Sequence, residues 1–162
     1  KIIMNELLQR KSVVKVKEYL QKIDKSIKLI VLKQTARTAA DAAKSLDKEV
    51  GSIVKSLLFK DNKEYYLCLI SGDKYASVDK ISNIIGNKIR KTDAKECKKF
   101  TGFSIGGVSP FAHDNAPKLI IIDENLSRFE KIYAAAGNSF VVFEISFTKL
   151  SNLTNGLIKD IT

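Results

Sequence analysis

Residues 53–70 read IVKSLLFKDNKEYYLCLI, two apolar runs separated by a short polar segment. Runs of this length on either side of a polar loop are typical of a β-hairpin. We expect strands over 53–59 and 64–70, with residues 60–63 as the turn. This hairpin places a β-sheet at the centre of the predicted fold.

Helical and strand patterns surround the hairpin without regular alternation. Ser12 and Thr38 are the expected N-caps of the first two helices, and Thr38 opens a segment with capping-box spacing. Helices are predicted over 12–23, 38–47, 78–86, 93–100 and 147–153, with 126–136 helical or irregular. Further strands are predicted over 27–33, 88–90, 118–122, 140–145 and 157–159. This order favours a mixed α/β fold, a mixed sheet or open barrel flanked by helices, over a doubly wound parallel sheet.

The chain of 162 residues fits one domain, 1–162, that can bury a sizeable core. Its hydrophobic fraction of 44% and charged fraction of 28% are ordinary for a globular protein. No apolar run has the length of a membrane span, and residues 1–4 lack the apolar region of a secretory signal. We therefore expect a folded domain with no membrane association.

Two cysteines and one histidine offer neither a disulfide framework nor a zinc-ligand cluster. Cys68, inside the second strand of the hairpin, is expected to be a free, buried thiol. These features predict a reduced, cytoplasmic protein without metal or cofactor.

The formal net charge is +10, which favours a polyanionic partner such as RNA. Arg90 and the lysines at 91, 95, 98 and 99 are one candidate phosphate-contacting patch. A codon bias that favours lysine is an equally good explanation of the overall charge. A solvated helix face is an equally good explanation of the patch.

Lys55 interrupts an apolar strand. By strand alternation it shares a face with Ile53, Leu57 and Phe59. A buried ammonium group without a partner is costly, so this side chain must either extend into water or meet an anionic or carbonyl group. The strand alone leaves both alternatives open.

A second candidate segment, residues 101–110, reads TGFSIGGVSP. Adjacent glycines, Gly106 and Gly107, let a ligand approach the main chain, whose N–H groups can hold a carbonyl or phosphate oxygen. A Gly-Gly pair before Pro110 is also a favourable turn. The segment is not a Walker A loop. His113 is the only histidine, so a catalytic triad would have to be built on it. A lone histidine in a loop is more often a hydrogen-bonded structural residue than a catalyst. The spacing of these residues therefore indicates no protein nucleophile.

In their order and spacing, these segments resemble the YbaK/EbsC family of trans-editing deacylases, over about residues 12–160. The same domain type occurs as an insertion in bacterial prolyl-tRNA synthetases. The segments that carry the resemblance are 35–43, 53–59, 101–110 with His113, 122–124, 133–137 and 153–156.

The resemblance implies a barrel-like mixed sheet flanked by helices and hydrolysis of the ester that joins a wrong amino acid to the tRNA 3′ end. Lys55 matches the family's functional lysine, placed to engage the terminal phosphate or the substrate carbonyl. Gly106 and Gly107 match the loop whose amides face the ester. Water, oriented by backbone groups and a ribose hydroxyl, would be the nucleophile. Expected substrate-binding residues are Thr38, Pro110, His113 and Asn138.

Residues 137–139 read Gly-Asn-Ser where many relatives have Gly-His-Pro, in a segment that lines the amino-acid pocket of related domains. Asn138 cannot act as a general base near neutral pH. The leading expectation is a mischarged tRNA(Pro) carrying a small residue such as Ala or Cys, with prolyl-tRNA synthetase as a candidate partner and the oligomeric state open. Alternatives are a non-catalytic tRNA-binding module of the same fold, which Asn138 favours, and a regulatory or cell-surface-related protein.

Overall fold

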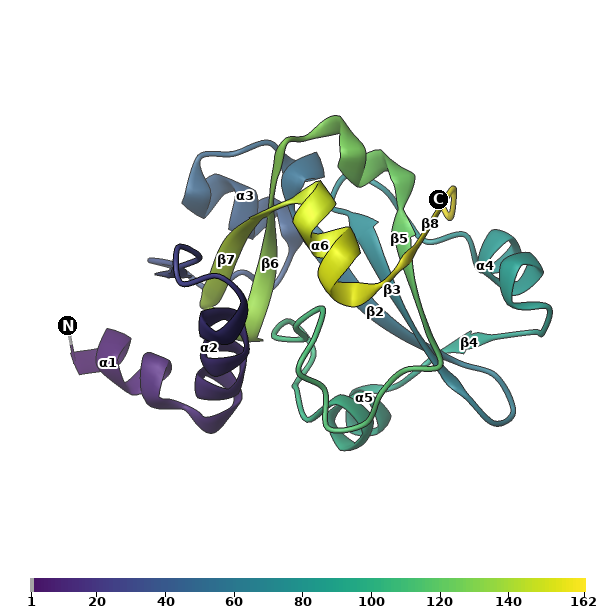
Figure 1. Ribbon diagram of the computed structural model, residues 1–162, viewed down its shortest axis with the longest axis horizontal. Coiled ribbons are helices and arrows are strands. Elements are labelled where there is room, and N and C mark those ends of the chain that lie inside the picture. Colours follow the sequence, from purple (N-terminus) through teal and green to yellow (C-terminus); the bar gives the residue numbers. More distant parts are fainter. Residues whose placement is uncertain (1) are drawn as a thin grey trace.

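The computed structural model describes residues 2–162, with side chains from residue 4 onward. Its elements are α1 (Ile2–Gln9), α2 (Lys11–Ile23), β1 (Leu29–Val31), α3 (Ala39–Leu46), the 3₁₀ turn η1 (Val50–Ser52), β2 (Val54–Lys60), β3 (Tyr65–Ser71), α4 (Val78–Ile85), β4 (Arg90–Lys91), α5 (Ala94–Thr101), β5 (Leu119–Asp123), the 3₁₀ turn η2 (Glu124–Arg128), β6 (Lys131–Asn138), β7 (Val141–Ser146), α6 (Phe147–Thr154) and β8 (Leu157–Lys159) (Figure 1). No helix among these described residues is both long and apolar enough to cross a membrane.

The predicted hairpin is confirmed, with each strand displaced by one residue. β2 and β3 pair antiparallel, and Lys55 lies opposite Ile70. β5 joins β3 in parallel, β8 joins β5 in parallel, and β4 covers the other edge, giving the order β4-β2-β3-β5-β8. The predicted mixed sheet is therefore present.

A second, antiparallel sheet has the order β1-β7-β6. It lies beside α2, and a single parallel bridge between Ile53 and Tyr133 connects it to the first sheet (Figure 1). The two sheets do not close into a complete barrel. This bridge brings the start of β2 against β6 and so brings together the segments that form the site described below.

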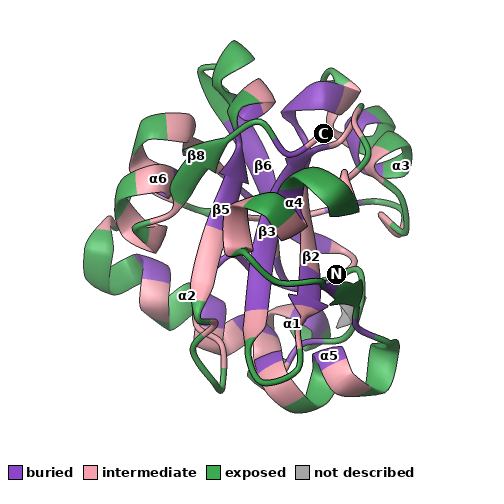
Figure 2. Cartoon of the chain, turned by 90° about the vertical axis from the view of Figure 1, so that its right-hand side faces the viewer, coloured by how far each residue is buried: buried purple, intermediate pink, exposed green. Residues whose placement is uncertain are grey.

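Side chains alternate across β2 and β3 and supply two separate cores. Val54 and Leu58 belong to the larger core, which also includes buried residues of α2, β6 and β7. Leu57 and Phe59 point the other way, into a smaller core closed by Ile81 of α4. β3 and β6 pass through the buried centre, whereas α4 exposes its outer face (Figure 2). Lys55 lies on the Leu57–Phe59 face, as predicted from alternation.

One secondary-structure prediction is wrong. Residues 131–136, expected to be helical or irregular, are part of strand β6, and only the preceding η2 is helical. The three consecutive alanines 134–136 have a high helix propensity, but pairing with β7 and the burial of Ile132, Ala134 and Ala136 override it.

The predicted helix caps have different outcomes. Thr38 is the N-cap of α3, and its hydroxyl accepts a hydrogen bond from the Asp41 amide at 3.1 Å. Ser12, in contrast, lies inside α2, which begins after Arg10 without a side-chain cap. The preceding helix α1 reaches nearly to α2, so the chain enters α2 directly from another helix. The predicted free thiol is confirmed, because Cys68 is unpaired and buried.

Candidate functional site

A cavity of about 620 Å³ lies where the two sheets meet. Its walls come from β2, β6 and β7, from the start of α3, and from the loops around residues 72–75 and 105–108. Three of the residues selected as catalytic or substrate-binding line it: Thr38, Lys55 and Gly106. Segments that are separate in the sequence therefore meet at one cavity.

Lys55 meets a carbonyl group, which is one of the two alternatives that the sequence left open. Its Nζ donates a hydrogen bond to the backbone carbonyl of Lys74 and lies 4.7 Å from the centre of the Tyr75 ring. Burial lowers the pKa of the Lys55 ammonium group, while the nearby Asp73 carboxylate partly opposes this effect. The result is a cation that is half withdrawn from water at the wall of a cavity, which is a favourable setting for binding or stabilising negative charge.

An ion pair behind Lys55 fixes the loop that carries Asp73. Arg128 donates hydrogen bonds to both carboxylate oxygens of Asp73, at 2.7 and 3.1 Å, and a third to the Ser71 hydroxyl at 2.8 Å. The arginine holds the pKa of Asp73 at about 2. Asp73 is therefore ionised at neutral pH and favours the charged form of Lys55.

This arrangement predicts the effect of neutralising Asp73. In Asp73→Asn the negative charge of the carboxylate is lost, while the positive charge of Arg128 remains. The missing anion and the unneutralised arginine both disfavour the charged form of Lys55. The midpoint of Lys55 deprotonation should move to lower pH, measured by NMR titration of the lysine side chain. Asp160→Asn removes an exposed carboxylate that pairs with Lys80 elsewhere and should leave the midpoint unchanged. An unchanged or raised midpoint in Asp73→Asn would contradict this electrostatic account.

The two glycines of the 101–110 segment differ in position. Gly106 has φ +90° and lines the cavity, and its N–H has no hydrogen-bond partner in the part of the chain that the structure describes. Gly107 is buried behind it, and its N–H already donates to the Ser104 carbonyl at 2.9 Å. Of the two glycine amides, only that of Gly106 is free among the described residues and belongs to a residue of the cavity lining, whereas the expectation was that both amides face the ester.

Gly107 serves the structure of the loop instead. Its carbonyl accepts a hydrogen bond from the Gly137 amide at 3.0 Å, and a Cβ at position 107 would lie 2.8 Å from the Asn138 nitrogen. The loop thus packs backbone to backbone against the end of β6, a contact that only glycine permits.

His113 and Pro110 do not line the cavity. The Nε2 of His113 donates to the Ser109 carbonyl at 2.6 Å, and the ring packs edge-on against Phe103. Burial lowers the pKa of His113, so the ring is neutral at neutral pH. Pro110 is buried in the same loop. These two residues lie in the segment that follows the glycine pair and outside the cavity lining, and their role in substrate binding stays a prediction.

Asn138 also points away from the cavity. Its Oδ1 accepts a hydrogen bond from the Phe140 amide at 2.9 Å and so closes the turn between β6 and β7, next to an irregularity in the strand pairing. The neighbouring Ser139 lines the cavity instead. Its carbonyl accepts from the Ala36 amide at 2.9 Å, and its hydroxyl lies 3.3 Å from that of Thr35. The departure at Asn138 therefore affects the turn more directly than the cavity wall.

Sequence reasoning missed several residues of the cavity. They are Arg37, Ser56, Asp73, Tyr75 and Ile105. Ser56 has a buried hydroxyl without a hydrogen-bond partner among the described residues. Of the suspected phosphate-contacting patch, Lys91 reaches the cavity, whereas Arg90 forms an ion pair with Glu96 at 2.7 Å. The only signal in the sequence was the proximity of some of these residues to Lys55 or the glycine loop.

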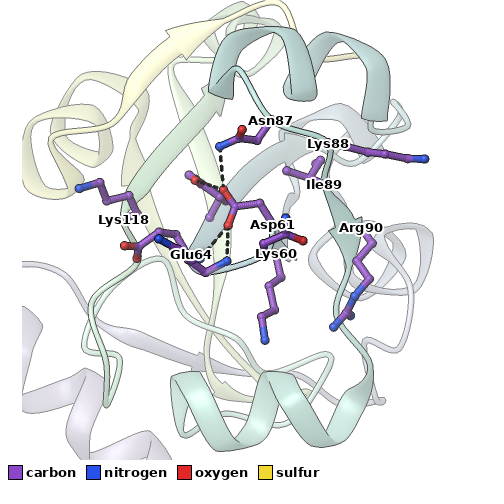
Figure 3. A pocket seen from close by; sticks show the side chains of 11 residues that line it. Lys60, Asp61, Glu64, Asn87, Lys88, Ile89, Arg90 and Lys118 are labelled. Carbon is purple, nitrogen blue, oxygen red and sulfur yellow. Dashed lines mark hydrogen bonds between the residues drawn. The ribbon is translucent and has the colours of Figure 1, made fainter.

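A second hollow, of about 780 Å³, lies at the tip of the β2–β3 hairpin (Figure 3). Asp61 at its centre accepts hydrogen bonds from the Lys63 and Glu64 amides, the Tyr66 hydroxyl and the Asn87 amide group. The side chains of Lys88 and Lys118 point away from it and from each other (Figure 3). Asp61 therefore ties the hairpin turn to the segment before β4, and no set of groups converges on a ligand here.

Known proteins resemble this chain in sequence and in fold. A proline–tRNA ligase of Lactobacillus helveticus is 32% identical over 108 residues, which are 66% of this chain and 19% of the ligase, so the chain spans about a fifth of that enzyme. An uncharacterized Bacillus subtilis protein, YwhH, is 28% identical over 121 residues, covering 74% of this chain and 76% of YwhH. A crystal structure described as a candidate trans-editing enzyme for prolyl tRNA synthetase superimposes with a TM-score of 0.89 at 32% identity, covering 94% of this chain and 98% of that one.

The family model of the aminoacyl-tRNA editing domain matches residues 33–153. This range contains the cavity lining described above, from Ala36 to Val142. The family resemblance expected from the sequence is thus confirmed, together with its mixed α/β fold. The chain belongs to the aminoacyl-tRNA editing domain family, in the branch related to prolyl-tRNA trans-editing.

Proposed function

We propose that this protein is an aminoacyl-tRNA deacylase, which hydrolyses the ester of tRNA(Pro) carrying a small wrong amino acid such as Ala or Cys. The observation that carries the proposal is that Lys55 and Gly106 line the same cavity, the first with an ammonium group and the second with an amide that has no hydrogen-bond partner among the described residues. One offers a positive charge and the other an N–H donor, the two kinds of group that stabilise a developing oxyanion.

In the proposed reaction, water attacks the ester carbonyl carbon and the carbonyl oxygen gains negative charge. The Gly106 amide and Lys55 stabilise this charge, and collapse of the intermediate breaks the bond to the ribose oxygen. That oxygen takes up a proton, leaving free amino acid and a tRNA with a terminal hydroxyl. No side chain needs to act as nucleophile; backbone groups and the neighbouring ribose hydroxyl orient the water, and His113, which lies outside the cavity lining, takes no part.

Small side chains on the cavity wall support the choice of a small amino acid. The wall includes Ala36, Ala135, Ser139 and Val142. Apolar walls of this kind discriminate by size, by about 10- to 200-fold for each methylene group. We expect Ala and Cys to be accepted and bulkier groups to be disfavoured.

The similarity to proline–tRNA ligase and to the candidate trans-editing enzyme supports tRNA(Pro) as the substrate and prolyl-tRNA synthetase as a partner that delivers it. The charge of +10 is consistent with a polyanionic substrate.

The proposal is tested by incubating the protein with tRNA(Pro) charged in turn with Ala, Cys, Ser and 2-aminobutyrate. Release of the amino acid should exceed spontaneous hydrolysis for at least one member, with the fastest release among Ala and Cys. The same panel on a second tRNA measures how far the tRNA body is recognised.

The alternative, a non-catalytic tRNA-binding module, predicts binding without turnover on every member of this panel. Its support in the sequence was Asn138, whose side chain closes a turn and does not line the cavity. Turnover on any member excludes this alternative, and binding without turnover excludes the deacylase.

A further inference from the structure

The rim of the cavity carries two apolar side chains that are unusually exposed. Tyr75 is 87% exposed and Ile105 is 58% exposed, the two largest values among the large apolar residues of the described chain. Both line the cavity, one from the loop after β3 and the other from the glycine loop. Neither contributes to a core, so burial on folding does not account for them.

Tyr75 is held in place despite its exposure. The Lys55 ammonium group lies 4.7 Å from the ring centre, and the same group is hydrogen-bonded to the carbonyl of the preceding residue, Lys74. The cation therefore occupies one face of the ring. Most of the remaining ring surface is open to solvent and available for stacking.

Two cations accompany these apolar groups. Arg37 and Lys91 line the cavity and are exposed, and neither forms an ion pair within residues 4–162. The carboxylate at this rim, Asp73, is already bound by Arg128. An open aromatic face beside unpaired cations is the combination that binds single-stranded nucleic acid, because bases stack on the ring and phosphates pair with the cations.

We propose that Tyr75 and Ile105 hold the base of the 3′-terminal nucleotide of tRNA, while Arg37 and Lys91 bind its backbone phosphates. This inference rests on the proposed function and assigns the residues that place the ester in the cavity. The family resemblance gave Lys55 two possible partners, the terminal phosphate and the ester carbonyl. With the phosphates on Arg37 and Lys91, Lys55 is free to act on the carbonyl.

The chain contains no tryptophan, so Tyr75→Trp introduces a single indole at an exposed position. Titration with the trinucleotide CCA should quench its fluorescence to saturation, and adding Lys91→Ala should weaken the binding at least threefold. Ile158→Trp, on an exposed position of β8 outside the cavity, is the matched control and should not respond. Absence of a saturable change in the Tyr75→Trp variant, or an equal change in both variants, would overturn the proposal.

A kinetic comparison separates this inference from the proposed function. Tyr75→Ala should raise KM for aminoacyl-tRNA about tenfold with little change in kcat, because stacking one base is worth about 1–3 kcal/mol. Tyr75→Phe should keep the wild-type KM. If Tyr75→Trp binds CCA but no ester is hydrolysed, the deacylase proposal fails and the nucleotide site stands. If hydrolysis proceeds with KM unchanged in Tyr75→Ala, the nucleotide site fails and the deacylase stands.

Discussion

Lys55→Ala is expected to lower kcat/KM for deacylation of a mischarged tRNA(Pro) by about 10²- to 10³-fold, the effect of removing one oxyanion-stabilising donor. The half-buried Lys55 is the cation that lines the cavity from within β2, whereas the other two cations of the lining, Arg37 and Lys91, are exposed. The measurement is release of labelled amino acid under single-turnover conditions. Because the side chain is only half buried, the variant should still fold.

Two variants control for this result. Lys60→Ala removes a lysine from the other end of the same strand, where its ammonium group lies 5.0 Å from the Tyr65 ring, outside the cavity. It should deacylate at nearly the wild-type rate. Lys55→Arg keeps the charge but changes its geometry, so we expect partial activity. Equal rates for wild type and Lys55→Ala would remove this lysine from the mechanism.

Gly137→Ala is expected to destabilise the fold by about 3 kcal/mol, as the sum of backbone strain and a steric clash. Gly137 has φ +88°, and a Cβ there would lie 2.4 Å from the carbonyl oxygen of Ser12 in α2. Its amide also donates to Gly107, so the substitution disturbs the contact that seats the glycine loop. The free energy of unfolding can be measured by urea denaturation, and a loss of deacylation should accompany it.

Gly86→Ala separates the two contributions. Gly86 has nearly the same conformation, φ +84°, but a Cβ there would meet nothing within 4 Å. Strain alone should cost about 1 kcal/mol at this position. If Gly137→Ala and Gly86→Ala lost the same free energy of unfolding, the close packing of α2 against the end of β6 would contribute nothing to the cost at Gly137.

The hairpin and the orientation of Lys55 could be predicted from the sequence. Alternate residues of a strand point to opposite faces of the sheet, and each face of this sheet packs into one of the two cores. Strand β6 could not be predicted in the same way. Its alanines are small enough to pack against α2 in either a helix or a strand, and the choice depends on β7, a partner that follows it in the chain. Local propensity carries no information about such a partner.

The candidate site was predictable where residue type alone restricts the role, as for Lys55 in an apolar strand and Gly106 in a glycine pair. The direction in which each side chain points could not be predicted from residue type. Asn138 and Ser139 are adjacent, and only the bulged end of β6 decides that the serine faces the cavity. Tyr75 lies in a polar loop with no periodic pattern, so its exposure became visible only in the folded chain.

The central claim is that this cavity hydrolyses the ester of a small wrong amino acid and spares the correct one. The most direct test compares release of Ala from Ala-tRNA(Pro) with release of Pro from Pro-tRNA(Pro), at equal enzyme concentration. The account predicts that Ala is released well above the spontaneous rate while Pro-tRNA(Pro) stays intact. Release of Ala no faster than in buffer, repeated with Cys-tRNA(Pro) and with tRNA still bound, would contradict it.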